Sequence, residues 1–155
     1  MKVTMLLCDA AEASEGKLFI LGGGWTITGP GPSPSAVALL IEVPWDQANH
    51  RNKLVLELLN EDGQPVIQPG PIPVPARVET EFEVGRPAGI APGTPLTVPL
   101  AVSIGPMQLT PGGRYYWKLT LNGESHEDWR LPFSVRPMPI LPGGFGPAEV
   151  PPSLP

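Results

Sequence analysis

The sequence has a single cysteine, few positive charges and no long hydrophobic run, and each of these features excludes a class of protein. With Cys8 alone, no disulfide can form within the chain. Ten Lys and Arg against fifteen Asp and Glu give a net charge of −5, and no basic cluster interrupts this balance. Nucleic acid and an anionic membrane surface are therefore not expected as partners. The longest apolar runs, such as residues 36–41, are far too short to cross a bilayer.

A signal-peptide pattern is also missing, because residues 1–3 lead directly into a short strand-like run, and we expect a cytoplasmic protein. Helical periodicity is absent apart from one plausible turn at residues 45–50. The chain has 23 prolines, which lack the backbone donor and disrupt a helix interior, so strands, turns and extended arms must build the fold. Together with 18 glycines, this composition raises the question of disorder. Hydrophobic residues at 41%, arranged at a period of two in separate runs, indicate a folded β domain instead.

Nine runs have the alternation of short strands: residues 3–9, 17–21, 25–28, 36–43, 53–60, 77–84, 96–104, 114–121 and 129–135. They predict an all-β domain over residues 1–136, built as an antiparallel two-sheet β-sandwich of the immunoglobulin-like type. A partly open β-barrel is the alternative, because strand counting does not reveal whether a sheet closes. Residues 137–155 are expected to form a Pro-rich extended C-terminal arm.

Two pairs of runs are predicted to form hairpins. Residues 17–21 and 25–28 flank Gly22-Gly23-Gly24, whose glycines can supply the positive φ values of a tight turn. Residues 114–121 and 129–135 place large aromatic and aliphatic side chains on one face and should pair across the loop that begins with Asn122-Gly123.

Three single strands carry further information. Residues 3–9 are apolar on both faces, which predicts a central or doubly covered strand. Residues 77–84 alternate apolar side chains with charged ones, so one face should be core and the other solvent. Pro99 removes a ladder donor from residues 96–104, which predicts an edge strand or a bulge.

Two Pro-rich segments stand outside the strand pattern. Residues 65–75 have proline at every second position near their end, which favours polyproline II or a sheet-edge arm. The last twenty residues carry seven prolines and only two charged residues, Arg136 and Glu149. Such stiff apolar segments lose little entropy on docking. The predicted interface residues are Pro71, Ile72, Pro73, Val74, Met138, Ile140, Leu141, Phe145, Val150 and Leu154.

Polar clusters give only weak functional signals. Residues 124–128 combine Glu, His and Asp, but neither zinc spacing nor a calcium-loop pattern is present, so a solvated loop is the favoured interpretation. Cys8 lies in an apolar strand and is expected to be a buried structural thiol. No cofactor or metal is expected.

Trp45 stands among polar residues near His50, and these two are the candidates for contact with a ligand or partner.

Three stretches carry a resemblance to a known family: Leu6-Leu7-Cys8-Asp9-Ala10-Ala11, the run from Gly16 to Trp25 (GKLFILGGGW), and the run from Trp117 to Glu124 (WKLTLNGE). With them, most of residues 3–135 resembles a family of small bacterial proteins known only as a domain of unknown function. The resemblance implies a compact β domain, and it implies no activity.

Because no catalytic set is visible, the leading hypothesis is a non-enzymatic, self-associating structural protein whose Pro-rich arms contact neighbouring subunits. A partner other than a second copy would be another protein. The first alternative is a binding module for a carbohydrate or protein. The second is a metal-dependent or hydrolytic enzyme built around His50, Glu124, His126 and Asp128, which would require those side chains to meet in space.

Overall fold

The structure of the protein is a computed structural model, and it describes residues 1–140. In this range the chain forms strands and two single-turn 3₁₀ helices, with no α-helix. The strands are β1 (Lys2–Ser14), β2 (Lys17–Gly23), β3 (Ile27–Thr28), β4 (Ser35–Val43), β5 (Arg51–Asn60), β6 (Ile67–Gln68), β7 (Val74–Pro75), β8 (Arg77–Glu83), β9 (Leu96–Ile104), β10 (Arg114–Leu121) and β11 (Arg130–Val135). The 3₁₀ helices are η1 (Trp45–Gln47), within the predicted helical turn, and η2 (Glu127–Trp129). Each of the nine predicted runs overlaps one strand, although β1 continues well beyond the predicted run of residues 3–9, and β6 and β7 are additional.

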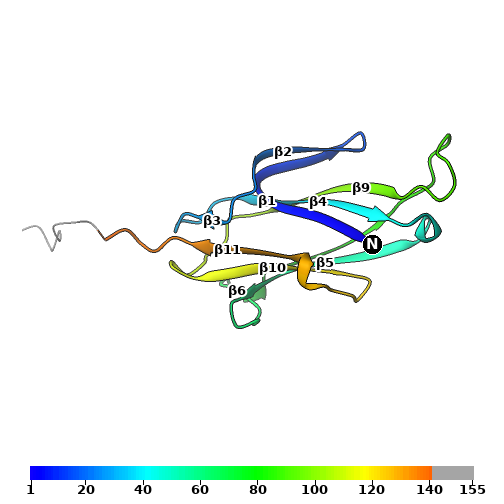
Figure 1. Cartoon of the computed structure of the whole chain (residues 1–155). Coiled ribbons are helices and arrows are strands. Elements are labelled where there is room, and N and C mark those ends of the chain that lie inside the picture. The colour runs from blue at the N-terminus through cyan, green and yellow to red at the C-terminus, as the bar shows by residue number, and fades with distance from the viewer. Residues whose placement is uncertain (141–155) are drawn as a thin grey trace, which may run out of the picture.

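The strands form two sheets that face one another as the layers of a sandwich (Figure 1). One sheet has the order β2-β1-β4-β9 and the other has the order β3-β11-β10-β5-β8, while β6 and β7 form a small separate ribbon. Neighbouring strands are antiparallel except β3 and β11, which run parallel. Within residues 1–140 no strand joins the two sheets into a closed barrel, so the predicted all-β sandwich is confirmed.

The core lies between the sheets and follows the period-two alternation of the sequence. In β4, Val37, Leu39 and Ile41 are fully buried, and in β10 the side chains of Trp117 and Leu119 are buried as well. Burying each such side chain stabilises the fold by about 1.5–3 kcal/mol relative to leaving it in water. This stabilisation favours the register in which these side chains face the opposite sheet.

Two pairing predictions are confirmed. β10 and β11 are neighbours, with Trp117 opposite Leu131 and Tyr115 opposite Phe133. β9 is the last strand of its sheet, as Pro99 predicted, because a residue without an N–H cannot serve two neighbours.

The predicted hairpin around Gly22-Gly23-Gly24 is wrong. β2 pairs with β1 through the two-residue turn Glu15-Gly16, whose φ values of 51° and 72° are both positive, as tight hairpins require. β3 instead joins the other sheet beside β11. The three glycines thus carry the chain from one layer to the other, and Gly22 and Gly24 use positive φ values of 61° and 87° to turn it.

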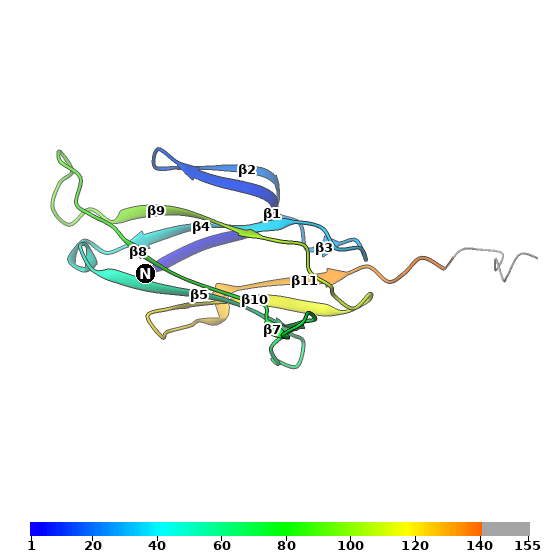
Figure 2. The same ribbon diagram turned by 180° about the vertical axis from the view of Figure 1, so that it is seen from behind.

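The β1–β2 hairpin turns out of its sheet and lies over the outer face of that sheet (Figures 1 and 2). Cys8 marks the bend, because it pairs with Gly23 of β2 and with Ala36 of β4. Cys8, Ala36 and Ala38 are buried on this outer face, and Leu18 of the hairpin packs against them. Their small side chains let the hairpin approach the sheet closely.

The Pro-rich segment of residues 65–75 forms a projecting ribbon beside the end of β5, on the side of β5 that faces away from β10. The Val66 N–H donates to the Leu58 carbonyl oxygen (3.0 Å), and the Leu58 N–H donates to the Ala76 carbonyl oxygen (2.9 Å). Between these attachment points β6 and β7 pair briefly. The remaining residues form an exposed tip, which matches the expected sheet-edge arm more closely than a free polyproline helix.

Candidate functional site

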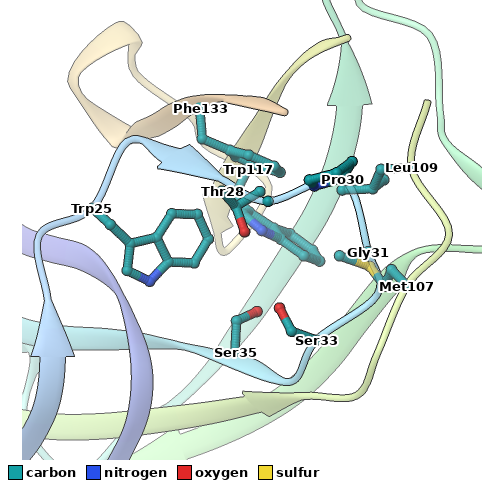
Figure 3. A pocket seen from close by; sticks show the side chains of 11 residues that line it. Trp25, Thr28, Pro30, Gly31, Ser33, Ser35, Met107, Leu109, Trp117 and Phe133 are labelled. Carbon is teal, nitrogen blue, oxygen red and sulfur yellow. The ribbon is translucent and has the colours of Figure 1, made fainter. Parts of the chain in front are cut away.

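A pocket opens at the end of the sandwich from which the C-terminal arm leaves. Its cavity volume is about 30 Å³, which is close to the volume of one water molecule, so it accepts a small group and not a whole segment. Its apolar wall comes from β10 and β11 of one sheet and from the three loops before β3, after β3 and before β10: Trp25, Pro30, Met107, Leu109, Trp117 and Phe133. Figure 3 shows the hydroxyl groups of Ser33 and Ser35 pointing toward the space between the two tryptophans. We call this site the Trp25 pocket.

The rigid part of the Trp25 pocket is aromatic. Trp117 projects from β10 and is only 2% exposed, so its position is fixed by the core. Trp25 precedes β3 and meets Phe133 of β11 edge-to-face, with ring centroids 5.8 Å apart. Such pairs add about 0.5–1.5 kcal/mol beyond their buried area. The opposite wall is the loop of Gly29-Pro30-Gly31, in which proline restricts the backbone.

Trp25 brings an unused hydrogen-bond donor to this pocket. Its Nε1–H is buried, and among the residues that the structure describes it is the one buried side-chain N or O atom without a hydrogen-bond partner. Leaving such a group unsatisfied costs about 1–3 kcal/mol. Because this N–H is itself buried, a ligand in the pocket could reach it only after the wall around Trp25 moves.

The arm begins at the rim of the same pocket. The Arg136 N–H donates to the carbonyl oxygen of Thr28, a pocket-lining residue, at 2.9 Å. From there residues 137–140 continue away from the sandwich beyond β11 (Figures 1 and 2). Met138 is 64% exposed and Ile140 is 94% exposed. The described start of the arm therefore leaves its own pocket open.

The predicted interface residues are exposed wherever the structure describes them. Pro71, Ile72, Pro73 and Val74 form the tip of the ribbon, and Ile72 is 78% exposed. Met138 and Ile140 lie on the arm. The four other predicted interface residues, Leu141, Phe145, Val150 and Leu154, lie outside the described residues.

Trp45 is half-buried and already has one neighbour on its ring face. The Arg86 guanidinium carbon lies 4.7 Å from the ring centroid, and the Arg86 Nη2 donates to the Trp45 carbonyl oxygen at 2.8 Å. A surface hollow beside the ring is lined by Met1, Pro44 and Pro95 among others. Trp45 can thus meet a partner, but Arg86 occupies part of its stacking surface.

The polar residues predicted as an alternative enzyme site are only partly brought together. His50 and Glu124 line one polar hollow. His126 instead rests edge-on against Trp129, with ring centroids 4.3 Å apart. Within residues 1–140, no three His, Cys, Asp or Glu side chains are grouped so that they could hold a metal ion.

Cys8 is the buried thiol that the sequence predicted. It is fully enclosed, and its Sγ–H donates to the Ala36 carbonyl oxygen at 3.4 Å. Burial raises the pKa of the Cys8 thiol, and the neighbouring Asp9 carboxylate raises it further. The neutral thiol is a weak nucleophile, which fits a structural role.

The acidic stripe of β8 is paired across the strand with basic residues of β5. Lys53 Nζ lies 2.7 Å from a carboxylate oxygen of Glu79, and Arg51 lies 3.7 Å from Glu81. The hydrogen bond from Lys53 lowers the pKa of Glu79, and the charges of Lys53 and Arg77 act in the same direction. This face of the sheet is exposed to solvent, as the strand alternation predicted, and its charges form a ladder of ion pairs.

Two features of the surface escaped the sequence analysis. Trp25 opens a run predicted as a strand, and nothing in that pattern indicated that it would be half-buried and line a pocket. The exposed apolar residues of β2 were also missed, although three consecutive large apolar residues in a strand are a usable signal. Phe19, Ile20 and Leu21 are 56%, 41% and 70% exposed.

Within the part of the chain that the structure describes, no helix is both long enough and apolar enough to span a membrane.

Comparison with known proteins gives a family and no nearer relative. No curated protein and no solved structure matches the chain. The model of a protein family matches residues 3–136, which include the Trp25 pocket and every strand but not the arm. This match confirms the resemblance to a family known only as a domain of unknown function. The chain belongs to DUF6941, a family of unknown function.

Proposed function

We propose that the protein is a non-enzymatic, self-associating structural subunit, and that its Pro-rich arm, residues 137–155, binds a neighbouring copy. The tip of the β6–β7 ribbon, residues 71–74, is a second apolar extension available for the same purpose. The proposal places the protein in the cytoplasm, and the single buried cysteine, with no disulfide partner, supports that placement.

We also infer that the sandwich is immunoglobulin-like. The layer β1-β4-β9 faces the layer β11-β10-β5-β8, and the short β3 runs parallel to β11 at the edge. Sandwiches of this type gather their loops at the two ends, where partners bind. The arm and the Trp25 pocket share one of these ends.

The observation that carries the proposal is the position of the arm's first residues. Arg136 is held at the pocket rim by Thr28, while Met138 and Ile140 extend into solvent. An apolar segment directed away from its own domain gains by reaching another one, because burial stabilises by about 25 cal/mol per Å² of apolar surface. At about 3.1 Å per residue, the nineteen residues after Arg136 could span roughly 60 Å.

The Trp25 pocket is the acceptor that suits this arm. Polyproline segments have no internal hydrogen bonds, so their carbonyl oxygens are free to accept, and they dock in grooves lined with aromatic rings. The pocket offers the rings of Trp25, Trp117 and Phe133, and the unpaired Trp25 Nε1–H lies buried beside them, where a small movement of the wall would expose it. Two copies that exchange arms end to end would each fill the other's pocket, which is a closed, self-complementary arrangement.

Sedimentation of three chains tests this proposal: the full chain, the chain ending at Arg136, and Trp25→Phe. Ending at Arg136 should lower the particle mass and leave the β circular-dichroism signal intact. Trp25→Phe keeps an aromatic ring but removes the N–H. It should lower the association constant about two- to tenfold, because the net free energy of one hydrogen bond corresponds to a factor of this size. Trp45→Phe, the same change outside the pocket, is the matched control.

A synthetic peptide of residues 137–155 gives a second, independent test. In excess it should compete with the tethered arm and reduce the particle mass of the full chain. Unchanged mass after arm removal, together with no effect of the peptide, would reject the arm as the subunit contact.

A second candidate function is favoured by the hollow beside Trp45, which suits a binding module for a carbohydrate or a protein partner. Met1, Pro44 and Pro95 give it apolar walls, and the half-buried Trp45 ring supplies a flat surface. A strictly monomeric full chain that binds such a partner, and loses it in Trp45→Ala, would favour this candidate over self-association.

A further inference from the structure

The free edge of β2 differs from the other three sheet edges. β9 has Pro99 in its middle, β3 has only two residues, and the exposed face of β8 carries Glu79, Glu81 and Glu83. Proline, shortness and charge are the common devices by which proteins prevent edge strands from pairing with other chains. β2 has seven residues, no proline and a single charge, Lys17, at its first position. It pairs with β1 on one side, and no strand of residues 1–140 pairs with its other side.

The side chains of β2 strengthen this contrast. Leu18 packs toward the sheet beneath the hairpin. Phe19 and Leu21 alternate with it and therefore belong to the opposite, outward face, where they are 56% and 70% exposed. Two large apolar side chains next to an unpaired backbone edge form a template for another strand.

We propose that this edge pairs with the β2 edge of a second copy of the chain, antiparallel and centred on Ile20. Among antiparallel registers, only this one places both exposed apolar residues of each copy, Phe19 and Leu21, directly opposite those of the other copy. Phe19 then lies opposite Leu21 of the partner subunit, and Leu21 lies opposite Phe19 of the partner subunit. Four large apolar side chains meet on one face, and directly opposed apolar pairs of this kind contribute about 0.2–1 kcal/mol each.

Charge favours a second copy as the occupant. The register keeps the two Lys17 side chains at opposite ends of the paired strands, about 20 Å apart at 3.4 Å per residue. Each Lys17 lies opposite Gly23 of the partner subunit. The Asp9 carboxylate lies against Gly22, the next residue, so the cation of one copy comes near an anion of the other. A net charge of −5 otherwise opposes association, and this is a place where the two copies do not repel.

The strand pair is small, and its size determines how strong it can be. Seven residues on each side give an interface at the low end of the range, below about 1,200 Å², which is typical of weak or transient contacts. This inference does not rest on the arm, because it uses a different surface. If both contacts form in one particle, each raises the effective concentration for the other.

Cysteine cross-linking of the full chain tests the pairing and its register. In an arrangement with two-fold symmetry, only the central residue meets its own copy. Ile20→Cys should therefore form a disulfide-linked dimer under mild oxidation, whereas Phe19→Cys and Leu21→Cys alone should cross-link poorly and a mixture of the two should cross-link well. Cys8 is buried and does not compete. Equal cross-linking of all single variants, or none in Ile20→Cys, overturns the proposal.

Lysine substitution gives an independent measurement. The double variant Phe19→Lys/Leu21→Lys changes only exposed side chains and should weaken the strand contact at least tenfold in sedimentation of the chain ending at Arg136 and of the full chain. Ile90→Lys, at another exposed apolar residue, is the matched control. If the chain ending at Arg136 associates equally well with and without the double lysine change, the β2 contact is overturned. If that chain associates and the double change abolishes the association, the result rejects the arm as the sole contact and supports β2.

Discussion

The Asp9 carboxylate lies directly against the backbone of Gly22, where the β1–β2 hairpin leaves its sheet. A Cβ placed on Gly22 would come within 2.7 Å of the Asp9 Cγ, and Gly22 has a φ of 61°. Two separate requirements thus call for glycine at this position: a left-handed backbone and room for a neighbouring carboxylate.

We expect Gly22→Ala to destabilise the fold by about 1–2 kcal/mol from the backbone alone, with a further cost from moving Asp9. Gly16→Ala is the matched control, because Gly16 has a φ of 72° but no atom within 4 Å of its Cβ position. Urea unfolding of both variants separates the two costs. If Gly22→Ala costs no more than Gly16→Ala, the Asp9 contact is irrelevant to stability, and Asp9→Ala in the Gly22→Ala background should then have no effect.

A pair of asparagines joins the start of β5 to the turn after β10. Asn52 is the buried polar residue of the described chain, 3% exposed, and its Oδ1 accepts from Asn122 Nδ2 at 2.9 Å. Asn52 Nδ2 donates to the His50 carbonyl oxygen at 3.1 Å, and Asn122 Oδ1 accepts from the Lys53 N–H at 2.9 Å. The two amides therefore satisfy one another and tie the β10–η2 loop to β5.

Asn52→Ala should lower the free energy of unfolding by about 1–3 kcal/mol, because it leaves polar groups unpaired in a half-buried site. Asn122→Gly removes the partner side chain and preserves the left-handed backbone, whose φ is 51°. A double-mutant cycle on these two changes should give a coupling of at least about 0.5 kcal/mol. Strict additivity would mean that the bond between the amides does not contribute.

Local sequence signals predicted the strands and one hairpin well, but they did not identify the partner of β2. Asn122-Gly123 marks the turn after β10 because both residues tolerate positive φ, and here both use it, at 51° and 81°. Gly22-Gly23-Gly24 also permits positive φ, which made it look like a hairpin turn. A glycine allows a hairpin turn but does not require one. The turn lies at Glu15-Gly16, where the glutamate gave no sequence signal for a positive φ.

The candidate site was less predictable than the fold for a physical reason. The Trp25 pocket is assembled from residues that are far apart in the chain, from Trp25 to Phe133, and its walls include three irregular loops. Strand alternation tells which side of a strand faces inward, but it says nothing about how loops close over the end of a sandwich. Trp25 precedes the two-residue strand β3, so the alternation of side chains could not assign it to the core or to solvent. In the structure it is half-buried.

The buried thiol gives a reporter of local opening and an alkaline pH effect. Native Cys8 should react with a thiol reagent at least about a hundredfold more slowly than in denaturant, since reaction requires the hairpin to open. Because its pKa is raised in the folded state, its contribution to stability is present below the ordinary thiol pKa and is lost as pH rises through the folded value. The free energy of unfolding of Cys8→Ala should therefore fall less steeply above pH 9 than that of the unchanged chain. Fast native labelling would contradict the enclosed geometry.

The Lys53–Glu79 pair makes the opposite prediction at acid pH. Glu79 has a lowered pKa in the folded state, chiefly through the Lys53 hydrogen bond, so its contribution to stability is present above the ordinary glutamate pKa and is lost as pH falls through the folded value. Lys53→Met should raise the pKa of Glu79 toward its ordinary value of 4.5, although Arg77, with its Nη2 3.2 Å from Glu79, retains part of the effect. A ¹³C NMR titration of the Glu79 carboxylate measures this directly. Lys2→Met removes the same charge from the other sheet and should leave the titration unchanged; equal shifts in both variants would mean that net charge, and not this contact, sets the pKa.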